Sequence, residues 1–380
     1  MAVDLTLDEF KDKLRGTEVE CKLCPTRSHS LIRHLRVKHH LSAGQYKKQY
    51  PEAKLASPLA TELLRKMGRQ AMTSADVESY MTQFGGTDAW DEKLAVIGAK
   101  FTNPPGSEAR VPVKDPHFAL MPDTALIAYA AEYGKNVYLE GPTGCGKTEW
   151  IIQTLARMGR PCMRVNMNGD VTAANFIGHV EADENGTKWV DGDLIVAAKG
   201  GFPVVIDEVD FCPPHIGAVL HPIMEGRKSI HVPYTGETVE CQPGFMIFAT
   251  ANTGGAGDLL GRHAGVEVLN QAFLDRFDLK LTADYLPIER EWPMLQSRFP
   301  GMTKPDEVLK VLKAANDVRA AYKKNSLRVT WSTRKLITFC EIREAFGQKI
   351  AMEKVLLNWL DAEDRAAVTE VLKRLALPVA

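Results

Sequence analysis

The stretch that most constrains the fold of this chain is Asn136–Trp150, with the sequence NVYLEGPTGCGKTEW. It has the pattern of a short apolar strand, a glycine-rich turn and the start of a helix. Four of its residues fit the pattern G-x-x-x-x-G-K-S/T, namely Gly141, Gly146, Lys147 and Thr148. In such a loop the backbone N–H groups surround phosphate oxygens, and the helix that follows points its positive end at the same anion. The stretch therefore predicts a phosphate-binding loop within an α/β domain.

The whole loop is expected to hold the phosphates of ATP, and it comprises Gly141, Pro142, Thr143, Gly144, Cys145, Gly146, Lys147 and Thr148. Lys147 can reach the β- and γ-phosphates, and the Thr148 hydroxyl can ligate Mg²⁺. A chance glycine-rich turn is the alternative, but the strand before the loop and the helix after it argue against that. We therefore expect ATP and Mg²⁺ as cofactors.

Length and composition set broader limits. The chain has 380 residues, which is long for one hydrophobic core and indicates two or three domains. Its net charge of -1 gives no electrostatic argument for a partner. The cysteines are odd in number and only Cys21 and Cys24 lie close together, which suits the reducing cytoplasm better than a disulfide framework. No signal peptide is evident and no apolar run reaches the roughly 18 residues of a membrane span, so no membrane contact is expected.

The N-terminal part carries a metal-ligand pattern. Cys21, Cys24, His34 and His39 follow the spacing C-x2-C-x9-H-x4-H. Two thiolates and two imidazoles make a tetrahedral Zn²⁺ set, and the two histidines lie a little over one turn apart on an expected helix. A segment this small buries too little apolar area alone, so Zn²⁺ would supply its folding energy. His40 is an alternative to His39 as the fourth ligand, and scattered thiols and imidazoles without metal are the other interpretation.

The short gap between Cys24 and His34 resembles the Ros/MucR-type bacterial zinc finger, as does the following segment, His40–Pro51. The resemblance covers about Cys21 to Pro58 and implies DNA binding. Residues 21–50 contain basic side chains and no acidic one, which is the footprint of phosphate contact. The alternative is a finger that docks a protein while its basic face stays in solvent, because the motif fixes the metal and not the partner.

From Asp123 the pattern is that of an α/β core. The expected elements are the helices Thr124–Tyr133 and Thr148–Met158 and the strands Val137–Glu140, Cys162–Asn166, Gly201–Asp207 and Phe245–Thr250. The third strand ends in Asp207 and Glu208. After a phosphate-binding loop, this acidic pair predicts that Asp207 holds Mg²⁺ and that Glu208 polarises the attacking water. Without such a loop the pair could be a solvated strand end.

Three later residues are candidates for the same site. Asn252 follows the fourth strand and can orient the lytic water or sense the γ-phosphate, although an Asn often caps a turn. Arg276 can act on the ATP of a neighbouring subunit as an arginine finger, or it forms a surface salt bridge. Arg334 lies in the first turn of a helix that Ser332 or Thr333 would cap. A cation there is unfavourable to the helix dipole, which indicates a role beyond stability.

In this order the motifs resemble those of the AAA+ ATPases and, among these, the MoxR branch, which includes the ATPase subunits of aerobic cobaltochelatases. The resemblance covers roughly His117 to Phe346 and rests on the phosphate-binding loop, Arg164–Asn166, Val205–Glu208, Phe248–Thr253, Asp275–Phe277 and Ser332–Arg334. It implies that Asn252 is sensor 1, that Arg276 is the arginine finger and that Arg334 is sensor 2. By the same resemblance Asn166 is a candidate for the residue that restrains Glu208 until a partner engages.

Two hairpins are expected inside this core. One spans Gly178–Leu194 with Asn185-Gly186 at its turn, and the other spans Lys228–Pro243 with Thr235-Gly236 at its turn. They resemble the helix-2 and pre-sensor-1 inserts of the MoxR branch, which face the ring axis. Trp189 is then a candidate contact with a remodelled partner, or it packs onto its own hairpin.

The C-terminal part resembles the helical lid of AAA+ proteins. Apolar residues recur at helical spacing in Pro305–Lys323, Thr333–Phe346, Glu353–Trp359 and Asp361–Leu375. We therefore expect an α/β P-loop protein with four parts. These are a zinc finger at residues 1–57, a helical connector at 58–116, a nucleotide-binding core with a parallel sheet between helices at 117–285, and a helical lid at 286–380.

These features predict a Mg²⁺-dependent ATPase that works as a homo-oligomeric ring, expected to be a hexamer, because the arginine finger acts in trans. The ring would remodel a protein partner, and in this branch the partner is typically a protein with a von Willebrand A domain. The alternative is a DNA-associated ATPase that the finger tethers to DNA. The finger departs from the cobaltochelatase pattern. A binding module with a decayed ATP site is disfavoured because every catalytic position is filled.

Overall fold

The computed structural model describes residues 90–377, apart from 122, 168–170, 185, 225–228, 233, 256, 258–265 and 267, together with the short pieces 19–23, 27–28, 49–50 and 52–53. The chain divides into two compact units, Met1–Tyr80 and Met81–Ala380. Each unit is described by itself.

The first unit contains a two-stranded antiparallel pair. Strand β1 (Val19–Glu20) pairs with β2 (Arg27–Ser28), and Cys21 is buried directly after β1. The other three predicted zinc ligands and the substitute His40 lie outside the described residues, and so do most residues of the predicted finger. The zinc site and its Zn²⁺ therefore stay a prediction.

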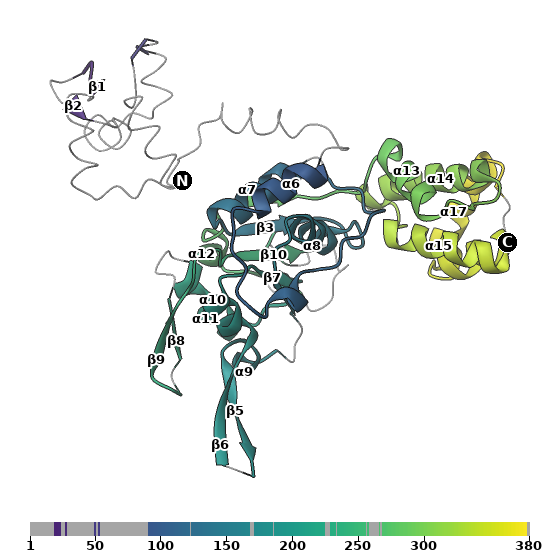
Figure 1. The fold of residues 1–380 in the computed structure, drawn as a ribbon. Helices are drawn as coiled ribbons and strands as arrows, with labels where there is room; N and C mark the ends of the chain where they lie inside the picture. Colours follow the sequence, from purple (N-terminus) through teal and green to yellow (C-terminus); the bar gives the residue numbers. More distant parts are fainter. Residues whose placement is uncertain are drawn as a thin grey trace. The chain divides into compact units, whose positions relative to one another are not determined.

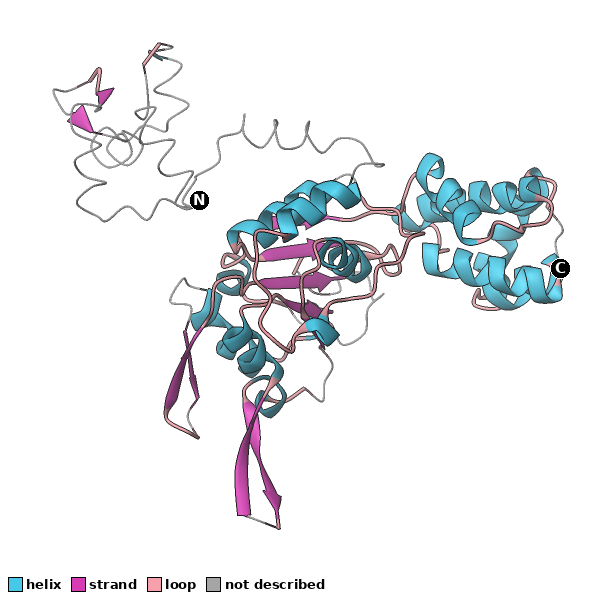
Figure 2. Cartoon of the chain, viewed as in Figure 1, coloured by secondary structure: helices cyan, strands magenta, loops and turns pink. Residues whose placement is uncertain are grey.

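The second unit is built on a five-stranded parallel sheet with the order β11-β3-β10-β7-β4 (Figure 2). The strands are β3 (Val137–Glu140), β4 (Met163–Asn166), β7 (Val204–Asp207), β10 (Ile247–Ala251) and β11 (Leu279–Thr282). Every residue of the central strand β10 is buried, as expected for a parallel sheet covered on both faces. Because the strands are parallel, their carboxyl ends meet at one edge of the sheet.

Helices cover this sheet (Figure 1). Helices α6 (Trp90–Gly98), α7 (Thr124–Tyr133) and α8 (Lys147–Arg157) pack on one another, and α8 lies against β7 and β10. Helix α10 (Asp193–Gly200) lies against β4. The shorter elements are η2 (Glu108–Arg110), α9 (Ala173–Phe176), η3 (Val209–Phe211), α11 (Pro214–Pro222) and α12 (Gln271–Leu274). The predicted parallel sheet between helices is confirmed.

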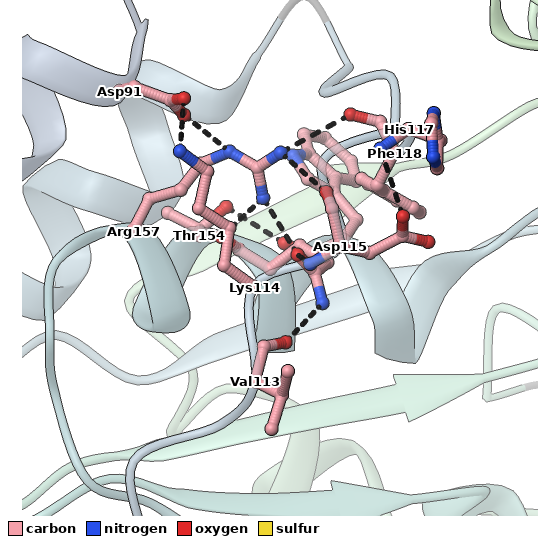
Figure 3. A network of polar contacts seen from close by, with 10 residues as sticks. Asp91, Val113, Lys114, Asp115, His117, Phe118, Thr154 and Arg157 are labelled. Atoms are coloured by element: carbon pink, nitrogen blue, oxygen red, sulfur yellow. Dashed lines mark hydrogen bonds and ion pairs between the residues drawn. The ribbon is translucent and has the colours of Figure 1, made fainter. Parts of the chain in front are cut away.

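Residues 111–118, called the strap below, run from η2 toward α7 and are tied to the last turn of α8 (Figure 3). The buried Arg157 of α8 places its Nε 2.7 Å from Asp91 Oδ1 of α6 and donates from Nη2 to the backbone oxygen of Asp115 at 3.0 Å. The Asp115 carboxylate pairs with Arg298, the last residue of helix α13 (Ile288–Arg298). Charge-assisted contacts thus join α6, the end of α8 and α13.

The C-terminal part is helical, with α13 (Ile288–Arg298), α14 (Pro305–Lys323), α15 (Thr333–Phe346), α16 (Gln348–Ala351), the π-helix η5 (Met352–Leu357) and α17 (Ala362–Arg374). We call residues 288–377 the lid. Its centre holds a buried bidentate ion pair between Glu291 and Arg319, with N–O distances of 2.6 and 2.8 Å. Glu291 also accepts a hydrogen bond from the Thr333 hydroxyl at 2.6 Å, so this pair fixes the start of α15.

Both predicted hairpins are present. Strands β5 (Gly178–Asp183) and β6 (Gly186–Asp191) form the first, and β8 (Ser229–Val232) and β9 (Glu237–Glu240) form the second. The third predicted strand is shorter than expected, because Gly201 ends helix α10 instead of starting β7. Within the described part of the chain, no helix is both long and apolar enough to cross a bilayer.

Candidate nucleotide-binding site

The glycine-rich loop lies between β3 and α8, at the carboxyl edge of the sheet. The Gly141 N–H donates to the backbone oxygen of Ala251 at the end of β10 at 3.2 Å, which anchors the start of the loop. Gly146, with a φ of 95°, precedes Lys147, the first residue of α8. Burial raises the pKa of the Cys145 thiol, so this side chain adds no negative charge to the loop. The start of α8 and a loop without an anionic thiol are therefore suited to bind an anion.

The Lys147 ammonium is held inside the loop. Its Nζ donates to the backbone oxygens of Gly141 and Pro142 at 2.8 and 3.1 Å, and to Asn252 Oδ1 at 2.9 Å. Burial lowers the pKa of Lys147, and the surrounding anionic groups oppose that shift. The contact with Asn252 brings the fourth-strand candidate to the phosphate-binding loop across a sequence gap of 105 residues.

Asp207, at the end of β7, is held by three side chains. Its Oδ1 accepts hydrogen bonds from the Thr148 and Thr250 hydroxyls, each at 2.5 Å, and its Oδ2 lies 2.7 Å from Arg164 Nη2. Burial by itself raises the pKa of Asp207, but these three donors hold the pKa below its usual value. The carboxylate is therefore ionised and fixed beside the Thr148 hydroxyl.

Glu208 follows in an unusual backbone conformation. Its φ of 57° lies in the left-handed region, which non-glycine residues rarely adopt, and its N–H donates to Thr250 Oγ1 at 3.2 Å. Such strained positions cluster at functional sites.

The turn that carries Asn252 is fixed by Asp210. This carboxylate is 0% exposed, and its Oδ2 accepts the backbone N–H groups of Asn252 and Thr253 at 2.8 and 3.1 Å. The Tyr138 hydroxyl donates to the backbone oxygen of Thr253 at 2.9 Å. Burial, with help from the nearby Asp210 and Glu140, raises the pKa of Tyr138, so its hydroxyl stays a donor. Sequence reasoning missed Asp210, although a third acidic residue follows Asp207 and Glu208 closely.

These groups surround one cleft of about 250 Å³. Its lining comprises Thr143, Gly144, Gly146, Lys147, Thr148, Glu149, Arg164, Asp207, Glu208, Thr250, Asn252 and Arg334. The predicted residue Arg334 thus joins the site from the lid. Arg276 and Asn166 are not among these lining residues of the described chain. Arg276 follows α12 and donates to the backbone oxygen of Ala272, and Asn166 pairs in register with Asp207 on the neighbouring strand.

Two segments contact the loop: the residues just before the lid and the start of the lid helix α15. Tyr285, in the segment before α13, donates its hydroxyl to the backbone oxygen of Thr143 at 2.9 Å, and the Arg319 guanidinium lies over its ring at 4.3 Å. Gly144 has a φ of 72°, and a Cβ built there would lie 2.6 Å from Ser332 Cβ. Ser332 caps α15 by accepting the Lys335 N–H. Only glycine fits at position 144, because the first turn of the lid helix occupies the space that a side chain would need.

The donor set suits Mg²⁺ beside a triphosphate. The Thr148 hydroxyl and the Asp207 carboxylate are hard oxygen ligands lying side by side in the cleft, and Mg²⁺ is held in proteins by one or two such groups together with substrate phosphates. Elsewhere, no group of three or more His, Cys, Asp or Glu side chains among residues the structure describes could hold a metal ion.

A different and larger cleft of about 740 Å³ lies between the two hairpins and is lined mainly by apolar side chains such as Ile177, Val180, Val219 and Ile230. Trp189 on β6 lines this cleft and stacks on Tyr234 at the turn of the second hairpin, with ring centroids 5.3 Å apart.

Trp189 also packs on its own hairpin. Its Nε1 donates to Asp191 at 2.9 Å, and its ring lies close to Gly178. The indole therefore packs on its own hairpin and also lines the cleft between the two hairpins. Its contact with a partner stays a prediction.

Comparisons with known proteins agree with this geometry. A family model described as "AAA domain (dynein-related subfamily)" matches residues 136–277. The aerobic cobaltochelatase subunit CobS of a Sinorhizobium species is 31% identical over 276 residues, which cover 70% of this chain and 83% of that protein. The chain belongs to the MoxR-type AAA+ ATPases.

Other relatives match over the AAA core. NorQ of Paracoccus denitrificans is 38% identical over 132 residues, covering 35% of this chain and 49% of that protein. CbbQ of Hydrogenophilus thermoluteolus is 35% identical over 128 residues, covering 33% of this chain and 48% of that protein. This MoxR-type AAA+ protein is thus an ATPase, and ATP is its nucleotide.

Proposed function

We propose that this MoxR-type ATPase assembles into a homo-oligomeric ring, taken to be a hexamer, and uses ATP hydrolysis to remodel a protein partner. The observation that carries the ring is the incomplete set of residues in the cleft. Lys147, Thr148, Asp207 and Glu208 line it, but Arg276 does not. An arginine that stabilises the transition state from a neighbouring subunit would complete the set.

In the proposed reaction a water attacks the γ-phosphate of ATP, with Glu208 as the general base. Lys147 holds the β- and γ-phosphate oxygens, and Asn252 orients the water through the turn that Asp210 fixes. Thr148 and Asp207 would hold Mg²⁺, which would neutralise charge on the phosphate oxygens. Arg334 contacts the phosphates from the lid, so that hydrolysis changes how the lid sits on the loop.

The partner is proposed to be a separate protein, because the relative CobS is named as a subunit of a cobaltochelatase. The two hairpins and the apolar cleft between them are proposed to face that partner. A protein with a von Willebrand A domain is our first candidate. Asn166, in register with Asp207, is proposed to restrain Glu208 until the partner engages. The cysteine content favours the cytoplasm as the compartment.

Mixing two inactive variants tests the ring. Arg276→Ala should abolish turnover and leave nucleotide binding largely intact, and Lys147→Ala should abolish both. In mixed rings, random pairing places an intact Lys147 next to an intact Arg276 at about a quarter of the interfaces, so turnover should partly return. Steady-state ATPase assays of the mixture check this. No recovery, in samples where co-purification of two differently tagged variants confirms that mixed rings form, would contradict the in-trans role.

A DNA-associated ATPase is the second candidate, and the basic stretch 21–50 favours it. In that case duplex DNA should stimulate turnover at low salt, and deletion of residues 1–57 should remove the response. Because phosphate contacts weaken steeply with salt, the stimulation should vanish at high salt. Turnover that ignores DNA at every salt concentration would assign the basic stretch to a protein-docking role.

A further inference from the structure

Asp207 has a partner that its proposed role as a metal ligand does not require. Asp207 Oδ1 already accepts the hydroxyls of Thr148 and Thr250, and Arg164 Nη2 lies 2.7 Å from the other oxygen, Oδ2. Both oxygens of the carboxylate are therefore engaged, one by neutral donors and one by a cation. Among the described residues, the Arg164 guanidinium supplies the opposite charge to Asp207 at hydrogen-bond distance.

The two members of this ion pair differ in freedom. The Asp207 side chain is 13% exposed and held by two further hydrogen bonds, whereas the Arg164 side chain is 55% exposed on the edge strand β4. A long, solvated side chain on an edge strand can move with little loss of packing, but the carboxylate cannot follow it. Arg164 is therefore the member that can leave.

We propose that Arg164 is a positioning residue that neutralises Asp207 until the metal binds, and that it has to release this carboxylate when Mg²⁺ arrives. This inference rests on the proposed role of Asp207 as a metal ligand. Without a cation beside it, a fixed carboxylate in the cleft would repel the incoming triphosphate. With Arg164 in place, the charge is balanced and the nucleotide can enter before the metal does. The same pair then competes with the metal for Oδ2.

The side chains that share the cleft support this division of roles. Lys147 points to the loop carbonyls and Asn252, and Arg334 comes from the lid, so Arg164 is the cation of the described cleft lining that pairs with Asp207. Arg164 is also the cleft-lining residue that comes from β4, opposite Val205 in the register of the sheet. A direct contact between Arg164 and the phosphates is the competing role, and the experiment below separates the two.

The test measures affinity for a fluorescent, non-hydrolysable ATP analogue in EDTA and again in saturating Mg²⁺. The readout is the affinity in Mg²⁺ divided by the affinity in EDTA. Arg164→Gln should weaken binding about three-fold in EDTA, as for a partly exposed ion pair, and should not weaken it in Mg²⁺, where Arg164 no longer competes with the metal for Asp207. The affinity in Mg²⁺ divided by the affinity in EDTA should therefore rise at least about three-fold. Arg164→Lys keeps the positive charge and should show a ratio near that of the wild type. This recovery would show that the effect of Arg164→Gln comes from the lost charge. Arg328→Gln, an exposed lid variant, is the matched control.

A double-mutant cycle with Asp207→Asn decides how Arg164 acts. If Arg164 acts through Asp207, then adding Arg164→Gln to the Asp207→Asn variant should have no effect on binding in EDTA. An unchanged three-fold loss in the double variant would overturn the proposal in favour of direct phosphate contact. An unchanged affinity ratio in Arg164→Gln alone would overturn it as well. Wild-type protein that binds the analogue in neither buffer would instead overturn the proposed function, and this inference with it.

Discussion

The two clefts of this protein are built by opposite means. The nucleotide cleft, about 250 Å³, lies at the ends of buried parallel strands and is lined by polar side chains that hold one another through short hydrogen bonds. The hairpin cleft, about 740 Å³, lies between two two-stranded hairpins and is lined mainly by apolar side chains. Tyr234 at its rim is 67% exposed. The nucleotide cleft thus belongs to the buried central sheet, whereas the hairpin cleft belongs to two-stranded elements outside that sheet.

Glu208→Gln, in the nucleotide cleft, should have the largest effect on turnover. Turnover should fall at least about 100-fold because the proposed general base is lost, while nucleotide affinity stays within about two-fold. Glu149→Gln is a matched control, since Glu149 lines the same cleft but has no proposed catalytic role. Single-turnover ATPase assays and nucleotide titrations would measure both quantities. Retained turnover in Glu208→Gln would remove Glu208 from the reaction.

Gly144→Ala should have an intermediate effect that depends on the lid. Its Cβ would meet Ser332, so we expect nucleotide affinity to fall about ten-fold as the lid moves off the loop. Gly159→Ala is the control, because Gly159 has a similar φ of 62° and a Cβ placed there would meet no described atom within 4 Å. Both variants carry the backbone cost of a left-handed alanine, about 1 kcal/mol. Equal losses of affinity in the two variants would show that the lid contact does not matter.

Trp189→Ala should have the smallest effect on turnover, which would show that the hairpin cleft is separate from the nucleotide cleft. Basal ATPase activity should stay unchanged, because the indole lines the hairpin cleft and not the nucleotide cleft. A double-mutant cycle with Tyr234→Ala, followed by urea unfolding, should give a coupling of about 1 kcal/mol for the stacked pair. A basal turnover reduced several-fold by Trp189→Ala would mean that the two clefts are not separate.

Much of the fold was accessible from the sequence, because local patterns are strong there. Helix α7 and strand β3 have the predicted bounds, and α14 and α15 do as well. Helix α13 was not predicted, since Pro293 inside it argues against a helix. Strand β11 was not predicted either, because four residues at the edge of a sheet carry too little periodicity.

The sequence predicted those site residues that belong to a sequence motif. It did not predict the residues that support the site through contacts with distant parts of the chain. Lys147, Asp207 and Asn252 come together as expected. The sequence did not indicate that Asp210 would hold the turn after β10, or that Tyr285 would bond to the loop, since each contact joins residues far apart in the chain. Asp210 had a local signal, a third carboxylate after Asp207. Tyr285 had none.

The contacts between the lid and the core have a mechanical consequence. They fall into two groups. In one, Ser332 of the lid lies beside Gly144, near the start of α8. In the other, Arg298 pairs with Asp115, which Arg157 at the end of α8 contacts, and Arg290 donates to the backbone oxygen of Leu120. The helix between them has 11 residues and is about 16 Å long. A body pinned at two separated points keeps a single rotation, about the line that joins them. The lid is therefore expected to rotate about an axis nearly parallel to α8. Loss of the γ-phosphate would act at the end of that axis beside the start of α8.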